Sequence, residues 1–391
     1  MNQVILKSGK DKRIKAGHLW VYQGEIGIIG IGVKSGEVVE VLDNRGRFLG
    51  IGYYNQASQI AVRLLTTSRE NINEDFFRRR LEQALSFRKR VLSKETSCYR
   101  VVFGEADLLP GLIVDRFQEY LVVQFLTMGM EVNRELILKL LVELCGPRGI
   151  IERSDLSVRH LEELPERSGC VYGDCPGSVV IRDNGLQFRV NLLEGQKTGY
   201  FLDQSANRAV LQEYAGGRRT LDCFCHLGSF AIHAAAYGAK EVLGIDISED
   251  AIELAEENAS LNGLGEKCEF KVANAFDFLR DQAGKKELYD LIILDPPAFT
   301  KSKQTLDSAI RGYKEINLRA MKLLPPGGIL VTCSCSHHLT PDLFWEVINA
   351  AAADNKRRIR LLERRTQNLD HPVLVGVPET EYLKCYIFEM M

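Results

Sequence analysis

Short apolar runs alternate with segments of helical periodicity between residues 220 and 336. The runs 241–245 and 291–294 have the length of buried strands, and the segments between such runs place apolar residues about 3.6 positions apart, as helices do. Regular alternation of strand and helix predicts a parallel sheet covered by helices on both faces. The expected fold class is therefore α/β, with a doubly wound sheet.

The centre of this pattern is the stretch 220–246, TLDCFCHLGSFAIHAAAYGAKEVLGID. It predicts a strand ending at Asp222, a tight turn with Gly228, an alanine-rich helix, and a second strand ending at Asp246. In a doubly wound sheet the carboxyl ends of the strands form the edge where ligands bind, and an acid there accepts hydrogen bonds from ribose hydroxyls. The stretch therefore predicts a site for a nucleoside-containing cofactor.

The turn after Asp222 distinguishes between cofactors. A dinucleotide fingerprint has the pattern GxGxxG, which brings backbone amides onto a pyrophosphate, whereas DCFCHLGS has one glycine and begins with an acid. A carboxylate repels phosphate but attracts the cationic sulfonium and amino groups of S-adenosylmethionine. We therefore expect S-adenosylmethionine rather than a nicotinamide cofactor. The alternative is an α/β core without a ligand, in which Asp222 only caps the next helix.

Two further strand ends carry polar residues. Asn274 follows the expected strand 269–272, at a point where related cofactor sites have an acid that holds the adenine amino group. Asp295 follows the apolar run 291–294 and precedes two prolines, which stop the strand there. An acid at this edge can hydrogen-bond or deprotonate a base. Lys301 and Lys303, on the next loop, could meet phosphates.

Two cysteines lie in the last clear strand, 329–338. A thiolate that adds to C6 of a pyrimidine makes C5 nucleophilic enough to attack a sulfonium, so a thiol at this edge has a specific chemical use. The strand should fray toward the following turn, which would leave Cys335 nearer the site and Cys333 more buried. Cys335 is therefore the expected nucleophile. The alternative is that both are core cysteines.

The first part of the chain has a different pattern. Residues 1–70 alternate short β-type runs with glycine turns, which predicts a small barrel. Residues 74–92 follow with helical spacing and are expected to begin an α/β unit without a catalytic constellation. One face of this helix should carry cations that are either solvated or in contact with phosphates: Arg78, Arg79, Arg80, Arg88, Lys89 and Arg90.

The composition indicates what kind of protein this is and where it is expected to be located. The chain has 391 residues, of which 45% are hydrophobic and 26% charged, as in soluble proteins of two or three domains. Its start lacks the apolar core of a signal peptide, and no apolar run reaches the roughly 18 residues of a membrane span, so the cytoplasm is the expected location. The ten cysteines are expected to be reduced. Cys170 and Cys175 do not complete a zinc pattern.

Charge is unevenly distributed along the chain. Residues 1–90 carry 16 Lys and Arg against 9 Asp and Glu, a net charge of +7, which leaves −9 on the remainder of a chain whose total is −2. A basic amino-terminal part followed by an acidic remainder favours a polyanion as the partner that residues 1–90 contact first.

Several segments together resemble a bacterial family of PUA-containing class I methyltransferases that make 5-methylcytidine in 23S ribosomal RNA. They are GQKTGYFLDQSANR, DCFCHLGSFAIHAAAYGA, DLIILDPPAFTKSK, RGYKEINLRAMKLL and GGILVTCSCSHH, and the resemblance continues through GEADLLPGLIVDR and the barrel segments GHLWVYQGEI and YYNQASQIAVRLL. It implies a PUA RNA-binding barrel over residues 1–70, a connecting α/β domain over 71–185, and a Rossmann-like methyltransferase domain over 186–391.

The resemblance also implies functional residues. Those for the cofactor are Gln204 and Arg208 before the first motif, Asp222, Phe224 and Gly228 within it, and Asp246 at the ribose. Ile247, Asn274 and Asp295, at or beside the strand ends, are further candidates for cofactor binding. The catalytic strand falls on Cys335 with its two serine neighbours. Many RNA 5-methylcytosine enzymes have a second cysteine where this chain has Pro297 and Ala298. Asp295 is therefore also the candidate for proton transfer, and the base that releases the product stays open.

The resulting hypothesis is methylation of RNA cytosine at C5 through a cysteine adduct, with the target base flipped out of its stack. The barrel, the helix over 78–90, Lys301 and Lys303 would hold the RNA, and the loop 195–200 either closes over the ligand or is an ordinary hairpin. Two alternatives are methylation of a guanine nitrogen without an adduct and an RNA-binding module with a regulatory nucleoside site. No membrane partner is expected, and the oligomeric state stays open, with a homodimer among the alternatives.

Overall fold

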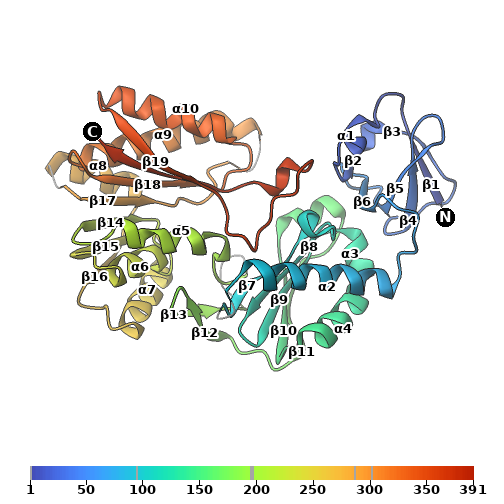
Figure 1. Ribbon diagram of the computed structural model, residues 1–391, viewed down its shortest axis with the longest axis horizontal. Helices are drawn as coiled ribbons and strands as arrows, with labels where there is room; N and C mark the ends of the chain where they lie inside the picture. Colours follow the sequence, from blue (N-terminus) through green and yellow to red (C-terminus); the bar gives the residue numbers. More distant parts are fainter. Residues whose placement is uncertain (1, 94–95, 194–197, 286–287, 301–302) are drawn as a thin grey trace. The chain divides into compact units, whose positions relative to one another are not determined.

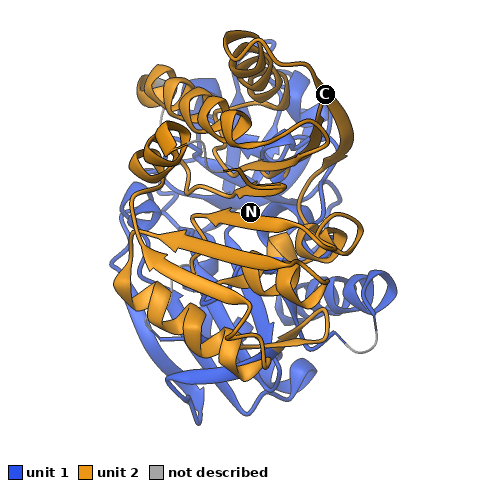
Figure 2. Ribbon diagram, turned by 90° about the vertical axis from the view of Figure 1, so that its left-hand side faces the viewer, with its two compact units in different colours: residues 1–181, 190–202, 369–380 blue, residues 182–189, 203–368, 381–391 orange. Residues whose placement is uncertain are grey.

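The computed structural model describes residues 2–93, 96–193, 198–285, 288–300 and 303–391 (Figure 1). These residues form two compact units, each built from several chain segments (Figure 2). Unit 1 comprises residues 1–181, 190–202 and 369–380, and unit 2 comprises 182–189, 203–368 and 381–391. The chain therefore passes between the units repeatedly.

Unit 1 begins with a six-stranded sheet in the order β2-β6-β5-β4-β1-β3. Its strands are β1 (Asn2–Leu6), β2 (Trp20–Val21), β3 (Ile26–Ile29), β4 (Val38–Leu42), β5 (Phe48–Tyr54) and β6 (Val62–Thr66), with the short helix α1 (Lys12–Lys15) between β1 and β2. This agrees with the short strands and glycine turns expected for residues 1–70. The buried core of this sheet includes Val4, Val41 and Val62, together with Val377 from far along the chain.

The second sheet of unit 1 has the order β11-β10-β9-β8-β7. Its strands are β7 (Cys98–Phe103), β8 (Leu112–Phe117), β9 (Tyr120–Phe125), β10 (Gly149–Ser154) and β11 (Arg167–Gly173), and its helices are α2 (Glu74–Val91), α3 (Met128–Val132) and α4 (Arg134–Cys145). The side chain of Asn73 caps α2 by accepting a hydrogen bond from Phe76 N at 3.1 Å. Phe76, Phe77 and Leu81 belong to the core of this sheet.

One prediction for α2 is wrong. Arg88 is buried, with 1% of its surface exposed, and pairs with Asp107. It follows the buried Leu81 and Ala84 at helical spacing, so it lies on the inner side of the helix rather than on a solvated face. On the outer side, Lys89 and Arg90 are exposed.

The expectation that all ten cysteines are reduced is wrong for one pair. Cys170 in β11 and Cys175, just after that strand, form a disulfide, with their Cα atoms 5.7 Å apart. That spacing lies within the range that a disulfide spans. The other eight cysteines of the described chain are not in disulfides.

Unit 2 is built on a sheet with the order β16-β15-β14-β17-β18-β20-β19, and β20 runs antiparallel to both of its neighbours. The strands are β14 (Arg219–Cys223), β15 (Glu241–Asp246), β16 (Cys268–Val272), β17 (Leu291–Leu294), β18 (Ile329–Ser334), β19 (Ile359–Arg365) and β20 (Lys384–Met390). The doubly wound α/β prediction is confirmed. Strand β18 was expected to be the last clear strand, but β19 and β20 follow it.

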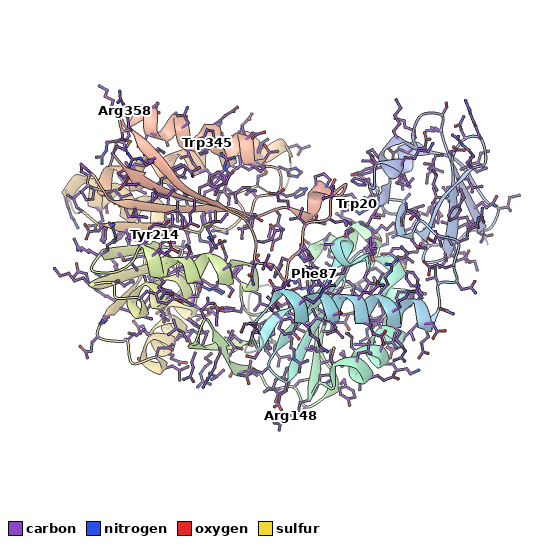
Figure 3. All side chains as sticks on the ribbon, viewed as in Figure 1. Trp20, Phe87, Arg148, Tyr214, Trp345 and Arg358 are labelled. Carbon is purple, nitrogen blue, oxygen red and sulfur yellow. A yellow bond between two sulfur atoms is a disulfide. The ribbon has the colours of Figure 1, made fainter. Side chains whose placement is uncertain are left out.

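Helices cover this sheet (Figure 1). They are α6 (Ser229–Ala236), α7 (Glu249–Leu261), α8 (Ala275–Lys285), α9 (Leu306–Leu323) and α10 (Pro341–Asp354), preceded by the short α5 (Ser205–Ala209) and the hairpin β12 (Ser178–Asp183) and β13 (Leu186–Asn191). Ser248 caps α7, since its side chain accepts a hydrogen bond from Ala251 N. Trp345 of α10, labelled in Figure 3, lies with its ring 5.9 Å from that of Phe388 in β20.

None of the helices described in the structure is both long enough and apolar enough to span a bilayer. Within the same residues, His, Cys, Asp and Glu side chains do not gather in groups of three or more that could hold a metal ion.

Candidate cofactor and catalytic site

Three acids meet where the strand order of unit 2 reverses. Asp222 lies at the end of β14 and Asp246 at the end of β15, while Asp295 directly follows β17. Strand β14 pairs with β15 on one side and with β17 on the other, so their carboxyl ends are adjacent. In doubly wound sheets the crevice at this switch point is the ordinary ligand site.

Asp222 is buried, and its two carboxylate oxygens have different surroundings. Oδ2 accepts a hydrogen bond from Ala231 N, in the first turn of α6, at 2.9 Å. The helix-capping role is therefore real, but it uses only one oxygen. Oδ1 is buried and has no hydrogen-bond partner among the described residues. Burial raises the pKa of this carboxyl well above its usual range, and the nearby charges of Asp295 and Asp246 raise it further.

A buried carboxylate oxygen without a partner is costly unless a donor reaches it. The amino group of S-adenosylmethionine is a cationic donor of the required kind. The donor set at this edge thus fits the cofactor that the turn sequence predicts.

The turn between Asp222 and α6 adopts an uncommon backbone conformation. Phe224 and His226 have φ angles of 65° and 49°, in the left-handed region, and Gly228 has a φ of 74°. Such residues are strained unless their surroundings hold them, and they are frequent at ligand sites. A Cβ on Gly228 would lie 2.9 Å from the ring of Phe270. This glycine is therefore required by core packing as well as by the turn.

Asp246 holds two loops through its carboxylate. Oδ2 accepts from His226 N and Oδ1 accepts from Ser248 N, both at 3.0 Å. The next residue, Ile247, is 71% exposed. Asn274 is also exposed, and its Oδ1 caps α8 by accepting from Phe276 N at 2.9 Å. The structure thus places all three at the carboxyl ends of β15 and β16, and their binding roles stay predictions.

The two residues predicted ahead of the first motif have different surroundings. Gln204 is buried and donates from Nε2 to Oδ1 of Asp295 at 3.0 Å, so it orients one acid of the site. Arg208 is fully buried and pairs with Asp183 at 2.7 Å. Its guanidinium thus forms an ion pair within unit 2, and its cofactor role stays a prediction.

Cys335 lies one residue beyond the end of β18 and is half-buried. Its Sγ lies 4.0 Å from the carbonyl oxygen of Pro296, in the loop that begins with Asp295. Cys333 lies inside β18 and is fully buried, and its interaction with Cys385, followed by burial, raises the pKa of its thiol well above the usual value. The predicted difference in burial is confirmed, while the nucleophilic role of Cys335 stays a prediction.

Three residues near Cys335 have no role in the sequence-based hypothesis. Phe299 packs against Tyr313 with ring centroids 4.6 Å apart, and the Tyr313 hydroxyl is hydrogen-bonded to Ser336 Oγ at 2.9 Å. Burial raises the pKa of Tyr313 to about 12. Lys384 lies at the start of β20, opposite Ser334 of β18. Lys384 carries no motif signal, because only strand pairing brings it to this edge. Tyr313 lies in the segment RGYKEINLRAMKLL, but nothing in the sequence gave it a role.

Some predicted residues lie outside what the structure describes. They are Lys301 and residues 195–197 of the loop before the first motif, and the side chain of Lys303 is not described either. Away from the acids, a cavity of about 720 Å³ includes Arg219, Glu241 and Lys267 at the amino ends of the strands. That position, opposite the switch point, makes it a poor candidate for the cofactor site.

Comparison with known proteins agrees with this geometry. Residues 156–386 match the model of the S-adenosylmethionine-dependent methyltransferase family, and residues 4–67 match that of the PUA-like domain. Ribosomal RNA large subunit methyltransferase I from Tolumonas auensis is 42% identical over 386 residues, which cover 97% of each chain.

Solved structures show the same fold over the whole chain. A Streptococcus mutans protein described as a SAM-dependent methyltransferase superposes with a TM-score of 0.86 at 22% identity, with 100% of both chains covered. A methyltransferase described as a complex with SAH gives a TM-score of 0.87 at 22% identity and the same coverage. The expected class, an α/β methyltransferase fold with a PUA-like domain before it, is thus confirmed. The chain belongs to the family of S-adenosylmethionine-dependent methyltransferases that includes ribosomal RNA large subunit methyltransferase I.

Proposed function

We propose that this protein forms 5-methylcytidine in 23S ribosomal RNA, with S-adenosylmethionine as the methyl donor. The observation that carries the proposal is the position of Cys335, a half-buried thiol beside the Asp295–Pro296 loop at the carboxyl edge of the methyltransferase sheet. Full-length relatives named ribosomal RNA large subunit methyltransferase I support ribosomal RNA as the substrate.

In this proposal Asp222 and Asp246 hold the cofactor. Oδ1 of Asp222 accepts from its amino group, and Asp246 accepts from the ribose hydroxyls. Ile247 and Asn274, exposed beyond β15 and β16, flank the adenine. When bound, S-adenosylmethionine supplies a methyl group on a cationic sulfur.

Cys335 makes the pyrimidine reactive. Its thiolate adds to C6 of cytosine, a C–S bond forms, and the electron pair of the C5–C6 double bond moves to C5, which becomes the nucleophile. After methylation of C5, a base removes the C5 proton, the double bond re-forms, and the C–S bond breaks to return the thiolate. Asp295, oriented by Gln204, is the proposed residue for proton transfer.

The first 70 residues are proposed to bind RNA as a PUA domain, residues 71–185 to connect it, and residues 186–391 to catalyse. Arg79, Lys89 and Arg90 are exposed cations of α2 that can contact phosphates, and Arg79 also pairs with Glu70. Arg88 is withdrawn from this surface because it is buried. We further propose that the protein acts in the cytoplasm. We also propose that it is a homodimer, and light scattering tests this oligomeric state.

Nucleoside mass spectrometry tests the activity. Deproteinised 23S RNA is incubated with isotopically labelled S-adenosylmethionine and the wild-type, Cys335→Ala or Cys333→Ala protein. We expect labelled 5-methylcytidine with the wild type and a loss of nearly all of it with Cys335→Ala, while calorimetry shows unchanged cofactor affinity. Cys333→Ala is the matched control, and it should keep most of the activity because Cys333 is a core residue.

The outcomes separate the alternatives. Comparable 5-methylcytidine from Cys335→Ala would refute the adduct through this residue. Labelled methylguanosine that survives the substitution would replace the mechanism and keep the cofactor. An absence of any labelled nucleoside, on naked RNA and on ribosomal particles alike, would favour an RNA-binding module with a regulatory nucleoside site.

A further inference from the structure

Lys384, the first residue of β20, is a buried cation beside the turn that carries Cys335. Only 4% of its surface is exposed. Its Nζ donates to the carbonyl oxygens of Ser336 and Tyr382, each at 2.8 Å. Both partners are neutral, and within the described chain no carboxylate lies at ion-pair distance from Nζ. An ammonium carries three N–H groups, so one donor is not used by these contacts.

The position of Lys384 relative to Cys335 follows from the sheet. In the antiparallel pair of β18 and β20, Lys384 lies opposite Ser334, and its Nζ binds the carbonyl of Ser336. Its backbone and its ammonium therefore contact the residues on either side of Cys335. Cys335 and Glu381 are the charged groups that act on Lys384, and the charge of Cys335 also acts on Tyr313.

We propose that Lys384 is a positioning residue of the methyl transfer: its ammonium holds the turn of residues 334–336 and stabilises the thiolate form of Cys335. The inference rests on the proposed function, in which Cys335 is the nucleophile. It assigns to Lys384 an electrostatic role toward this thiol.

Formation of the thiolate requires the loss of one proton from Cys335. The Cys335 S–H bond breaks, its proton passes to water, and the electron pair stays on sulfur as the thiolate. Lys384 stays protonated throughout, so its charge favours the thiolate before C6 is attacked and again when the C–S bond breaks. A nearby lysine is one of the recognised means of lowering the pKa of a cysteine.

Burial supports this assignment. It lowers the pKa of Lys384 to about 8, while the negative charge of Cys335 acts in the opposite direction. At neutral pH the side chain is therefore still cationic. A buried ammonium held only by carbonyl groups is costly, and an anionic sulfur within its field offsets part of that cost.

The rival explanation is structural, with Lys384 only joining β20 to the turn through its two hydrogen bonds. Lys384→Gln separates the two readings, because an amide NH₂ can still donate to carbonyl oxygens but carries no charge. Lys384→Met removes both the charge and the donors. Lys384→Arg keeps the charge, and Lys240→Met removes an exposed lysine elsewhere in unit 2 as a matched control.

The test is alkylation of Cys335 by iodoacetamide as a function of pH in the full-length protein, followed by peptide mass spectrometry. We expect Lys384→Gln and Lys384→Met to move the midpoint of Cys335 alkylation upward by about one pH unit or more, which is about tenfold less thiolate at neutral pH. Lys384→Arg should keep most of the wild-type midpoint, and Lys240→Met all of it. Cofactor affinity should stay unchanged in every variant.

If folded Lys384→Gln has the same midpoint of Cys335 alkylation as the wild type, the inference is overturned. If Lys384→Met fails to fold, Lys384→Gln alone provides the test. Because alkylation needs no RNA and no turnover, its result is independent of the proposed function. Loss of methylation in Cys335→Ala with no effect of Lys384→Gln on the thiol would refute only the role of Lys384. Full methylation by Cys335→Ala would refute the nucleophile, whatever the thiol midpoint.

Discussion

At the scale of single residues, the proposed cofactor contact of Asp222 and the stability of the fold make opposite demands on its carboxylate. This group is buried beside two other acids, and within the described part of the chain one of its oxygens has no donor. Because its folded-state pKa is raised, the folded protein binds more protons than the unfolded chain between the ordinary pKa and the raised one. The stabilising contribution of Asp222 therefore falls as pH rises through that window.

Replacing Asp222 by Asn should stabilise the cofactor-free protein and weaken cofactor binding. The amide keeps an oxygen for Ala231 N but carries no charge, so the cofactor-free protein should unfold at a higher temperature at neutral pH. Cofactor affinity should fall about tenfold or more, the loss expected for a hydrogen bond to a charged group. Wild-type affinity should also decrease as pH falls and Asp222 is protonated. Calorimetry and thermal unfolding measure these changes.

Asp250→Asn is the control for this prediction, since Asp250 is an exposed acid in the first turn of α7. It should leave cofactor affinity and its pH dependence unchanged. Equal affinity of the Asp222→Asn and wild-type proteins would place the cofactor elsewhere.

Residues at strand ends were predictable from the sequence, and residues brought in by packing were not. Asp222, Asp246 and Asp295 each follow an apolar run, so the strand pattern alone places them at one edge. Lys384 belongs to a strand that the pattern did not predict. The burial of Arg208 could not be anticipated either, because its partner Asp183 lies in a hairpin 25 residues earlier.

At the scale of elements, α2 illustrates how one charge can belong to the inner face of an amphipathic helix. Arg88 donates to the carbonyl oxygen of Arg100 at 2.9 Å and to that of Asp370 at 2.8 Å, in addition to its pair with Asp107. It thereby joins α2 to β7 and to the segment 369–380 within unit 1. Helical periodicity counts an arginine as polar, which explains why the sequence placed it on the wrong face.

Arg88→Met should destabilise α2 and β7 locally by about 3 kcal/mol, because it leaves Asp107 as a buried charge without its partner. Hydrogen exchange of the amides in these elements measures the loss without requiring the whole chain to unfold in one step. Arg90→Met, an exposed change on the same helix, should alter exchange by no more than about 0.5 kcal/mol. Equal protection in the two variants would contradict the role of Arg88.

The C-terminal strands show a second limit at this scale. Strand β19 alternates between half-buried and exposed positions, yet four of its seven residues are charged, which obscures a strand pattern. Strand β20 is almost wholly buried because it inserts between β18 and β19. Neither position follows from local periodicity, since both depend on pairing with a strand far earlier in the chain.

At the scale of the whole molecule, units and sequence order do not coincide. The segment 369–380 belongs to unit 1 although it lies near the end of the chain. Val377 is fully buried in the core of the first sheet, and Glu379 pairs with His18 at 3.2 Å. A sequence reading divides the chain into consecutive domains and cannot detect such a return, because one buried valine carries no distinguishing pattern.

Val377→Ala should therefore loosen strands more than 300 positions earlier in the sequence. The loss of buried methyl groups costs about 2 kcal/mol, so amides of β4, β5 and β6 should exchange roughly tenfold faster or more, while those of β14 and β17 in unit 2 stay unchanged. Val375→Ala removes the same groups from a side chain that is 93% exposed and should have no effect. Equal exchange in the two variants would refute the contribution of Val377.

The return of Val377 to the first sheet bears on how the protein is made. Domains usually fold in order as they leave the translating ribosome. Here the amino-terminal sheet is synthesised first, but a buried part of its core is encoded more than 300 residues later. This sheet reaches its final packing only after residue 377 has been made, so a chain truncated before residue 377 would carry it with an unfilled core.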